Sequence, residues 1–244
     1  MKQKIHDIEK FREKQHVFTD RLEAGEILGS MLKTEYNHVE YGMVLAIPSG
    51  GVPVAINVSK TLGLPLDLLI VRKLQIPGNP EAGFGAMALD GTIFLNEALL
   101  AELHLNPALI EAEKRRVAME LEKRNVMFRK GRPSSDLVGK TVILVDDGLA
   151  SGFTMLASVH MTKKAKARET VVAVPTAPQR SIDRILSEVD KIYCANIRTT
   201  PFFAVAEAYG HWYDLSEREV LDLLKTRNGL NQGRKTSSKT NKTN

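Results

Sequence analysis

The stretch VILVDDGLASGFT, from Val142 to Thr154, decides the fold and the candidate site of this 244-residue chain. Its first four residues, Val142 to Val145, are all apolar, which is typical of a strand buried on both faces. Two adjacent carboxylates, Asp146 and Asp147, follow the strand directly. A turn of small residues, Gly148 to Gly152, comes next and leads into a second apolar stretch. The whole stretch therefore predicts a strand, a tight loop and a helix.

The loop is suited to a phosphate group with two acids beside it. Small residues let backbone N–H groups approach an anion closely, and a helix N-terminus carries partial positive charge. Ser151 and Thr154 add hydroxyl donors. Acids next to a phosphate repel it unless they bind something else, and sugar hydroxyls or a Mg²⁺ ion fit that role. A phosphorylated sugar satisfies both halves of the motif.

The rest of the chain alternates between predicted strands and predicted helices. Asn106-Pro107 is a typical helix start, and Asp90-Gly91 between two apolar runs is a strong hairpin signal. The alternation predicts an α/β fold with a doubly wound, mostly parallel sheet, interrupted by the hairpin and one long helix. Further strands are expected at 43–47, 66–71, 170–174 and 190–195, and helices at 7–34, 52–62, 106–129, 179–188 and 216–224.

Three polar loops follow predicted strands of this sheet. They are Ser49-Gly50-Gly51, Arg72-Lys73 and the loop from Asp146 to Thr154. Because ligands in such sheets bind at the carboxyl ends of the strands, we expect the three loops to meet in one site. A Gly-Gly pair alone is more often a plain turn, but three anion-friendly loops at three strand ends are hard to explain by packing.

Composition narrows the class of protein. A hydrophobic content of 43% is ample for a core, and no apolar run approaches the 18 residues of a membrane span. The first residues are charged and lack the apolar stretch of a signal peptide. The single cysteine, Cys194, fits a reducing compartment and is expected to be a small buried residue. We therefore expect a cytoplasmic protein that has no membrane partner.

The net charge of +5 belongs to the C-terminal tail. Residues 226–244 contain five cations and no acids, and the rest of the chain has equal numbers of both. A basic pI that comes from a tail does not predict a nucleic-acid-binding face, so we do not expect a nucleic-acid partner. The tail is rich in Asn, Lys, Thr and Ser, which predicts disorder.

These motifs together resemble the type I phosphoribosyltransferases. VILVDDGLASGFT is similar to their signature for phosphoribosyl diphosphate (PRPP), IPSGGVP to their pyrophosphate loop, and VRK to the basic pair after the next strand. The segments VRKLQIPGNPEAGFGAMALDGTIFLNE, VAVPTAP and WYDLSEREV resemble a bacterial and archaeal group within that family whose substrate base the resemblance does not identify. The likeness covers about residues 17–225 and implies a Rossmann-like fold.

The resemblance implies a role for each loop. Asp146 and Asp147 would hold the ribose hydroxyls, directly or through Mg²⁺, and would be the metal ligands. The 5-phosphate would lie against Ala150, Ser151, Gly152, Phe153 and Thr154. Pyrophosphate would be held by Ser49, Gly50 and Gly51, with an unusual peptide geometry at Ser49-Gly50, and neutralised by Arg72 and Lys73. The reaction implied is transfer of 5-phosphoribosyl from PRPP to a nitrogenous base or similar nitrogen acceptor, with Mg²⁺ as cofactor and pyrophosphate as product.

Three residues depart from the family pattern. Gly148 stands where the family usually has an apolar residue, and Ser49 stands where it often has Arg or Lys. Ala150 occupies a position that carries an acid in the hypoxanthine-guanine branch, which disfavours that branch. An acid there can act as a general base on the purine.

We divide the chain into a domain of residues 1–225 and the tail. Within the domain, residues 74–130 would form a lid of hairpin and long helix, with Glu81 a solvated carboxylate or a contact to Mg²⁺ or substrate. Residues 196–215 would form a hood over the base, in which an aromatic side chain could stack. Phe202, Phe203 and Trp212 fit either that role or plain packing, and His211 fits a surface position better than a general base.

Four classes of function remain open. The first is a phosphoribosyltransferase, and the second is a non-catalytic regulator that senses PRPP or a nucleotide. A hydrolase acting on a phosphorylated sugar and a receiver-type domain with a phospho-accepting Asp are further alternatives. Arg72 and Lys73 favour the enzyme over the regulator, and Ser151, Gly152 and Thr154 argue against a receiver domain because they line a site for bound phosphate. The acceptor base and the oligomeric state, including a homodimer, stay undetermined.

The tail gives the first prediction. A chain that ends at Lys225 should retain the full activity of the longer chain, because a short basic tail is usually solvated and contributes no part of the site. Comparing the turnover of the two chains at equal concentration checks this. A large loss of activity on truncation would show that the tail is functional.

Overall fold

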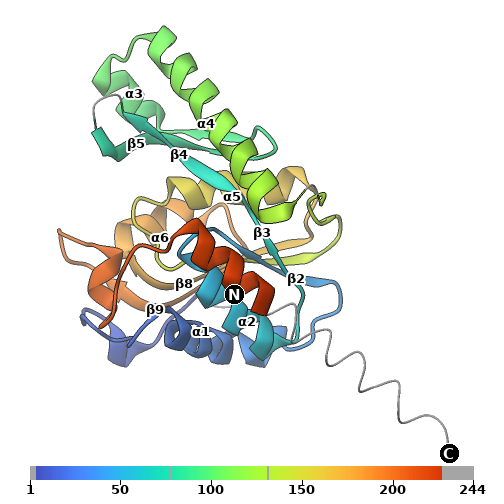
Figure 1. Ribbon diagram of the computed structural model, residues 1–244. Helices are drawn as coiled ribbons and strands as arrows, with labels where there is room; N and C mark the ends of the chain where they lie inside the picture. Colours follow the sequence, from blue (N-terminus) through green and yellow to red (C-terminus); the bar gives the residue numbers. More distant parts are fainter. Residues whose placement is uncertain (1–3, 77–78, 131, 227–244) are drawn as a thin grey trace, which may run out of the picture.

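The centre of the protein is a parallel sheet of six strands (Figure 1). The computed structural model describes residues 4–76, 79–130 and 132–226. Every pair of neighbouring strands in this sheet is parallel. In spatial order the strands are β1 (Ile5–His6), β9 (Lys191–Arg198), β8 (Glu169–Pro178), β7 (Thr141–Val145), β2 (Gly42–Ala46) and β3 (Leu66–Leu68).

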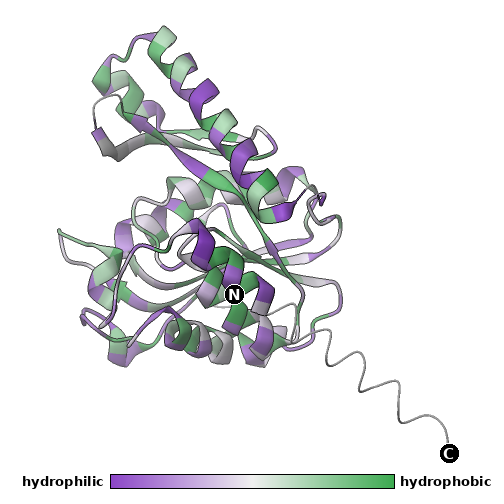
Figure 2. Cartoon of the chain, in the orientation of Figure 1, coloured by the Kyte–Doolittle hydropathy of each residue, from purple (hydrophilic) through white to green (hydrophobic). Residues whose placement is uncertain are grey.

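Helices cover both faces of this sheet, as the alternation of strands and helices predicted. Along β7, Ile143 and Val145 belong to the core beneath α1 (Arg21–Tyr36) and α2 (Gly51–Leu62). Val142 and Leu144 belong to the core beneath α5 (Phe153–Lys164) and α6 (Gln179–Leu186). Successive strand residues point to opposite faces, so a continuous apolar run supplies both cores. Figure 2 shows hydrophobic residues along the strands and polar residues on the outer faces of the helices.

A second lobe rises from the edge of the central sheet (Figure 1). It is an antiparallel sheet of β4 (Val71–Ile76), β5 (Asn79–Ala88) and β6 (Ile93–Leu95), with α3 (Glu97–Leu103) and α4 (Pro107–Arg129). The predicted hairpin is present, and Thr92 donates two hydrogen bonds to the Asp90 carboxylate at its turn. The predicted start of the long helix is also confirmed, since the Asn106 side chain accepts from the Ala108 backbone N–H at 2.8 Å.

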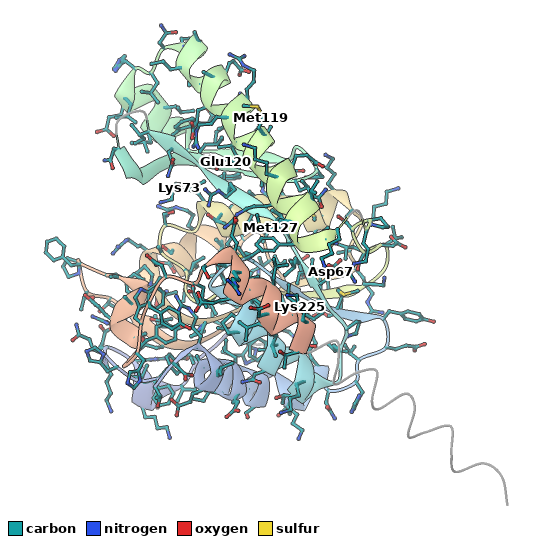
Figure 3. All side chains as sticks on the ribbon, in the orientation of Figure 1. Asp67, Lys73, Met119, Glu120, Met127 and Lys225 are labelled. Carbon is teal, nitrogen blue, oxygen red and sulfur yellow. The ribbon has the colours of Figure 1, made fainter. Side chains whose placement is uncertain are left out.

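The second lobe is tied to the central sheet at both of its ends. Lys164 of α5 forms an ion pair of 3.0 Å with Asp90, beside a stacked contact between Phe94 and Phe153. At the end of α4, the buried Arg129 pairs with Asp67 of β3 at 3.0 Å. Figure 3 shows Asp67 near that end of α4. These contacts join the base of the lobe to α5 and to β3.

The predicted helix over residues 7–34 is wrong in its first half. The helix begins at Arg21, because the Asp20 carboxylate accepts from the N–H groups of Leu22 and Glu23. Upstream, β1 pairs with β9 and a short 3-10 turn follows at Glu9–Phe11. The apolar residues of that stretch pack on the core from an irregular segment, and Phe18 is 1% exposed. Their spacing therefore matched a helix by coincidence.

The single strand predicted over 66–71 is wrong, because β3 ends at Leu68 and β4 begins at Val71 in the second sheet. The apolar run over 68–71 does not mark where the chain leaves the central sheet. The remaining predicted elements are found, with longer strands in two places. Strand β8 runs to Pro178 and β9 to Arg198, each past the predicted end. The closing helix spans residues 217–226, and the Ser216 backbone N–H donates to Glu219 as the capping pattern predicted. Cys194 is fully buried. In the described part of the chain no helix is long and apolar enough to cross a membrane. Residues 227–244, most of the predicted tail, lie outside the described residues.

Helices α1 and α2 approach closely through glycine. A Cβ atom on Gly25 would lie 2.5 Å from the carbonyl oxygen of Val54, and one on Gly29 would lie 2.8 Å from Thr61. A backbone carbonyl inside a helix cannot move aside as a side chain can. The separation of the two helices is therefore set at Gly25, one turn from Arg21 at the start of α1.

We predict that Gly25→Ala destabilises the protein by about 1–3 kcal/mol, the usual cost of overpacking a core. This loss should appear even though alanine is the better helix former. Urea unfolding followed by circular dichroism measures the change. Ser30→Ala, on the exposed face of the same helix, is the matched control and should change stability little. Equal stability of the glycine and alanine proteins would contradict the packing described here.

Candidate active site

The three predicted loops meet in one cavity of about 680 Å³ at the carboxyl ends of β2 and β7. Segments distant in sequence supply the remaining walls, among them the start of α1, the C-terminal part of α4 and the region from η2 (Val205–Ala208) onward. The predicted site residues that line this cavity are Ser49, Gly50, Arg72, Lys73, Asp146, Asp147, Ala150, Ser151, Gly152 and Thr154.

The loop after β2 lies directly against the two acids. A Cβ atom on Gly50 would lie 1.8 Å from Asp147 Oδ2, and one on Gly51 would lie 2.7 Å from the Val145 carbonyl oxygen. Only glycine allows the backbone to come this close. Gly51 supports the site from beneath and does not line the cavity. The expected unusual peptide is a cis bond at Pro48–Ser49, one residue before the predicted position; the residue pattern located the turn but not the bond within it.

Asp147 is held from the opposite side by Arg21. The Arg21 Nε donates to Asp147 Oδ2 at 2.8 Å, and its Nη1 donates to the Tyr213 carbonyl oxygen at 2.9 Å. The guanidinium carbon lies 3.9 Å from the ring centroid of Trp212, which is a close cation–π contact. Arg21 is only 6% exposed, so its charge is directed at Asp147 and not at solvent.

The pKa values of Asp146 and Asp147 are both raised, so ionising the pair is unfavourable. Burial and the neighbouring Asp147 carboxylate raise the pKa of Asp146 well above its ordinary value. Burial also raises the pKa of Asp147, although the Arg21 guanidinium acts in the opposite direction. Two like charges withdrawn from solvent disfavour each other's ionisation. A cation or a set of hydroxyl donors bound at the pair would therefore relieve an unfavourable charge.

The loop from Gly148 to Thr154 has an open helix N-terminus. Gly152 adopts φ +85° immediately before α5, and within the described residues no side chain caps that helix. Ser181 and Arg184 of α6 donate to the carbonyl groups of Ala150 and Ser151, which fixes the loop from behind. The first N–H groups of α5 are thus left for an anion in the cavity.

Two further residues of the loop have roles in packing. The Phe153 side chain stacks on Phe94 and lies under Arg184, so it does not line the cavity, and only its backbone can serve a ligand there. A Cβ atom on Gly148 would lie 2.4 Å from a methyl group of Val205. The glycine that departs from the family pattern therefore makes room for Val205 at the start of η2.

The predicted basic pair lies on β4 of the second lobe and lines the same cavity as the acids. Arg72 donates to Glu120 Oε2 at 3.0 and 3.3 Å, so part of its charge is compensated within the lobe. Lys73 is exposed and lies where β4 faces the body of the protein (Figure 3). The Glu81 side chain, a candidate contact in the predicted lid, lies outside the described part.

The segment predicted as a hood contributes a smaller set of residues than expected. The residues of this segment that line the cavity are Val205, Trp212, Asp214 and Leu215. Phe202 is 89% exposed, so it neither lines the cavity nor packs in the core, and both roles considered for it are wrong. Neither Phe203 nor His211 is among the lining residues, and His211 is exposed as expected.

Arg21 and Arg124 also line the cavity, and neither was predicted from the sequence. The position of each residue in its helix is nevertheless informative. A cation in the first turn of a helix opposes the helix dipole, and Arg21 is the first residue of α1. Arg124 is three residues after Leu121 and four before Phe128, so it occupies the apolar face of α4. A charge in either position calls for a partner outside the helix, but the sequence cannot show which one.

The acid pair fits Mg²⁺ only in combination with a substrate. Carboxylate oxygens are suitable ligands for Mg²⁺. Because the pKa values of both acids are raised, a cation bound beside them would favour their ionised forms. The described residues contain no group of three or more His, Cys, Asp or Glu side chains that could hold a metal ion. Mg²⁺ is often bound by one or two carboxylates plus substrate phosphates and water, and this pair matches that pattern.

Comparison with known proteins identifies the family of the chain. Residues 21–211 match the family described as "Phosphoribosyl transferase domain", so the chain belongs to that family. It is 38% identical over 210 residues to "Putative phosphoribosyl transferase MT0597" of Mycobacterium tuberculosis CDC 1551, and equally to "Putative phosphoribosyl transferase Rv0571c" of strain H37Rv. The match covers 85% of this chain and 46% of each relative, so the chain spans about half the length of these curated relatives.

The crystal structure of TT1426 from Thermus thermophilus is similar to this protein. The two chains are 33% identical with a TM-score of 0.70, and the match covers 85% of this chain and 97% of that one.

The charge of the acid pair gives a prediction about stability. Because the folded pKa of Asp146 is raised above its unfolded value, the folded state loses stability as the pH rises from about 4 through the folded pKa. Asp146→Asn removes that loss and should raise the melting temperature near pH 7.5 by about 2–4 °C, the effect of roughly 1 kcal/mol in a domain of this size.

Melting curves between pH 4.5 and 8 check this prediction. The gap between variant and wild type should widen as the pH rises, whereas the exposed Asp183→Asn control should follow the wild type. A variant that melts at or below the wild type at every pH would contradict the raised pKa.

Proposed function

We propose that this chain transfers a 5-phosphoribosyl group from PRPP to a nitrogen acceptor and releases pyrophosphate. The observation that carries the proposal is the contact between the Ser49–Gly51 loop and the Asp146-Asp147 pair, beside an uncapped helix N-terminus. PRPP has a phosphate, a ribose diol and a pyrophosphate in fixed relation to one another. The cavity offers a matching surface for each of the three groups.

The ribose 5-phosphate half would lie on the β7 side of the cavity. The 5-phosphate would accept from the N–H groups at the start of α5 and from the hydroxyls of Ser151 and Thr154. The ribose hydroxyls would donate to Asp146 and to the oxygen of Asp147 that Arg21 does not hold. Arg21 favours the ionised form of Asp147 and holds its carboxylate in place, which makes it a positioning residue.

The pyrophosphate would lie on the β2 side, against Ser49 and Gly50. Arg72 and Lys73 approach from the second lobe and would compensate its negative charge. The Arg72–Glu120 ion pair is partly exposed and therefore weak enough to open when a stronger anion arrives. Such an exchange would draw the second lobe toward the ligand, as in other enzymes with closing segments.

The chemical step breaks the bond between C1 of the ribose and the pyrophosphate oxygen, which keeps the electron pair. A bond forms between C1 and the acceptor nitrogen, and the proton of that nitrogen passes to the departing pyrophosphate. The transition state resembles an oxocarbenium ion, so catalysis depends on charges placed near C1 and the leaving group and on excluding water. When bound at Asp146 and Asp147, Mg²⁺ would add positive charge beside the departing pyrophosphate.

The acceptor would lie near Trp212. One face of its ring is covered by Arg21, so the ring is held rigidly as a wall of the cavity. Val205 and Leu215 add apolar surface, and Asp214 adds a carboxylate that can accept a hydrogen bond from an N–H group. This combination favours a flat acceptor that carries at least one N–H donor.

Calorimetry with PRPP and Mg²⁺, followed by a screen of nitrogenous bases for pyrophosphate release, tests the proposal. We expect PRPP to bind only weakly without Mg²⁺ and at least one base to support release. The double variant Asp146→Asn, Asp147→Asn should lose PRPP binding, because both groups that hold the ribose would be neutral.

The exposed Asp183→Asn variant is the control and should bind PRPP as the wild type does. Unchanged affinity in the double variant would refute the roles of the two acids. Tight PRPP binding without release for any base would favour the regulatory alternative.

A further inference from the structure

Arg124 is a cavity residue that neither the motifs nor the family resemblance pointed to, and it reaches the pyrophosphate loop. It lies on α4, about 75 residues from that loop in sequence, and lines the cavity. Its Nη1 is 3.5 Å from the Pro48 carbonyl oxygen and its Nη2 is 3.5 Å from Ser49 Oγ. The two ends of the guanidinium fork therefore both face the loop.

The rest of the Arg124 side chain is held in place by two neighbours. Its Nε donates to Glu217 Oε1 at 2.9 Å, and the guanidinium carbon lies 5.7 Å from the ring centroid of Phe128. The side chain is 14% exposed. An arginine buried to this extent has lost most of its hydration, so its charge acts strongly on any neighbour in the cavity.

The contacts of Arg124 with the loop are long for hydrogen bonds. Typical N–H···O distances are about 2.9 Å, so contacts of 3.5 Å engage the fork only loosely. The bond to Glu217, in contrast, has the typical distance of 2.9 Å and fixes the direction in which the fork points. The guanidinium thus points at the loop but makes only weak contacts with it. Such a group can bind a planar or tetrahedral anion that lies between it and the loop.

The position of Arg124 compensates for the absence of a basic side chain at residue 49. The family often has Arg or Lys at that position, and here the hydroxyl of Ser49 stands beside a guanidinium that comes from another element. We propose that Arg124 of α4 binds the pyrophosphate of PRPP and of the product, supplying from the second lobe the positive charge that residue 49 lacks. The inference rests on the proposed use of PRPP. Glu217 of the closing helix is its positioning residue.

The arrangement also connects three parts of the chain. Arg124 belongs to the second lobe, Ser49 to the central sheet and Glu217 to the closing helix. Anion binding at this point would pull Arg124 toward the loop and with it the C-terminal part of α4. Pyrophosphate would then be sensed by two successive turns of α4, through Glu120 and Arg72 on one turn and Arg124 on the next.

Separate binding measurements with pyrophosphate and with ribose 5-phosphate, each with Mg²⁺, test the inference. Arg124→Ala should weaken the binding of pyrophosphate and of PRPP by about 10- to 100-fold, the range for lost charged hydrogen bonds, and leave ribose 5-phosphate unchanged. Arg124→Lys keeps the charge but loses the fork and should recover part of the affinity. The exposed neighbour Lys123→Ala is the matched control and should bind all three ligands as the wild type does.

Glu217→Gln tests the positioning role. It should raise the KM for PRPP several-fold with a smaller change in kcat, and in the double variant with Arg124→Ala it should add nothing further. Additive effects would show that Glu217 acts independently of Arg124.

Three other results would be decisive. Wild-type binding of PRPP together with unchanged pyrophosphate affinity in Arg124→Ala overturns the role of Arg124 and leaves the proposed function standing. Equal weakening of pyrophosphate and ribose 5-phosphate overturns it too, because the variant would then disturb the whole site. Failure of the wild type to bind PRPP overturns the proposed function first, and the inference with it.

Discussion

The site depends on one close contact, the packing of the Asp147 carboxylate between the backbone of Gly50 and the guanidinium of Arg21. It joins the loop after β2, the loop after β7 and the start of α1, three segments distant in sequence. The contact needs a glycine on one side and a buried cation on the other, because a Cβ atom would occupy the place of the carboxylate and an unpaired buried charge would be costly. The separation of α1 from α2, set at Gly25, determines where Arg21 stands.

The same contact explains why the two acids are unequal. Burial raises the pKa of both acids, but Arg21 opposes the rise at Asp147, whereas the neighbouring carboxylate adds to it at Asp146. A site that stores like charges in this way is less stable than one with a neutral side chain, and natural proteins accept this cost where a ligand later relieves it. The residues with the least favourable electrostatics are thus the ones that any ligand with hydroxyl donors or a bound cation would stabilise.

Much of this arrangement could be predicted from local sequence. The motif from Val142 to Thr154 contains its own strand, loop and helix start, so its pattern determined both the fold class and eight residues of the cavity wall. The helix predicted over 7–34 failed because apolar spacing cannot distinguish a helix from an irregular segment packed on the core. Arg21 and Arg124 could not be assigned, since their partners come from elements that only the tertiary fold brings near. Phe202 shows the opposite case, an aromatic residue in a plausible segment that the fold leaves exposed.

The positions that sequence patterns missed are also the ones that connect the parts of the molecule. A motif built from adjacent residues can form a phosphate loop alone, but it cannot place a cation from α4 opposite Ser49. Residue 49 can therefore lose a basic side chain without the cavity losing positive charge, provided that another element supplies it at the same point. Electrostatic compensation depends on distance and burial, and not on order along the chain. A residue that departs from a family motif should therefore be assessed by the charges that surround it in the folded protein. By that criterion the side of this cavity that we propose for pyrophosphate retains its positive charge.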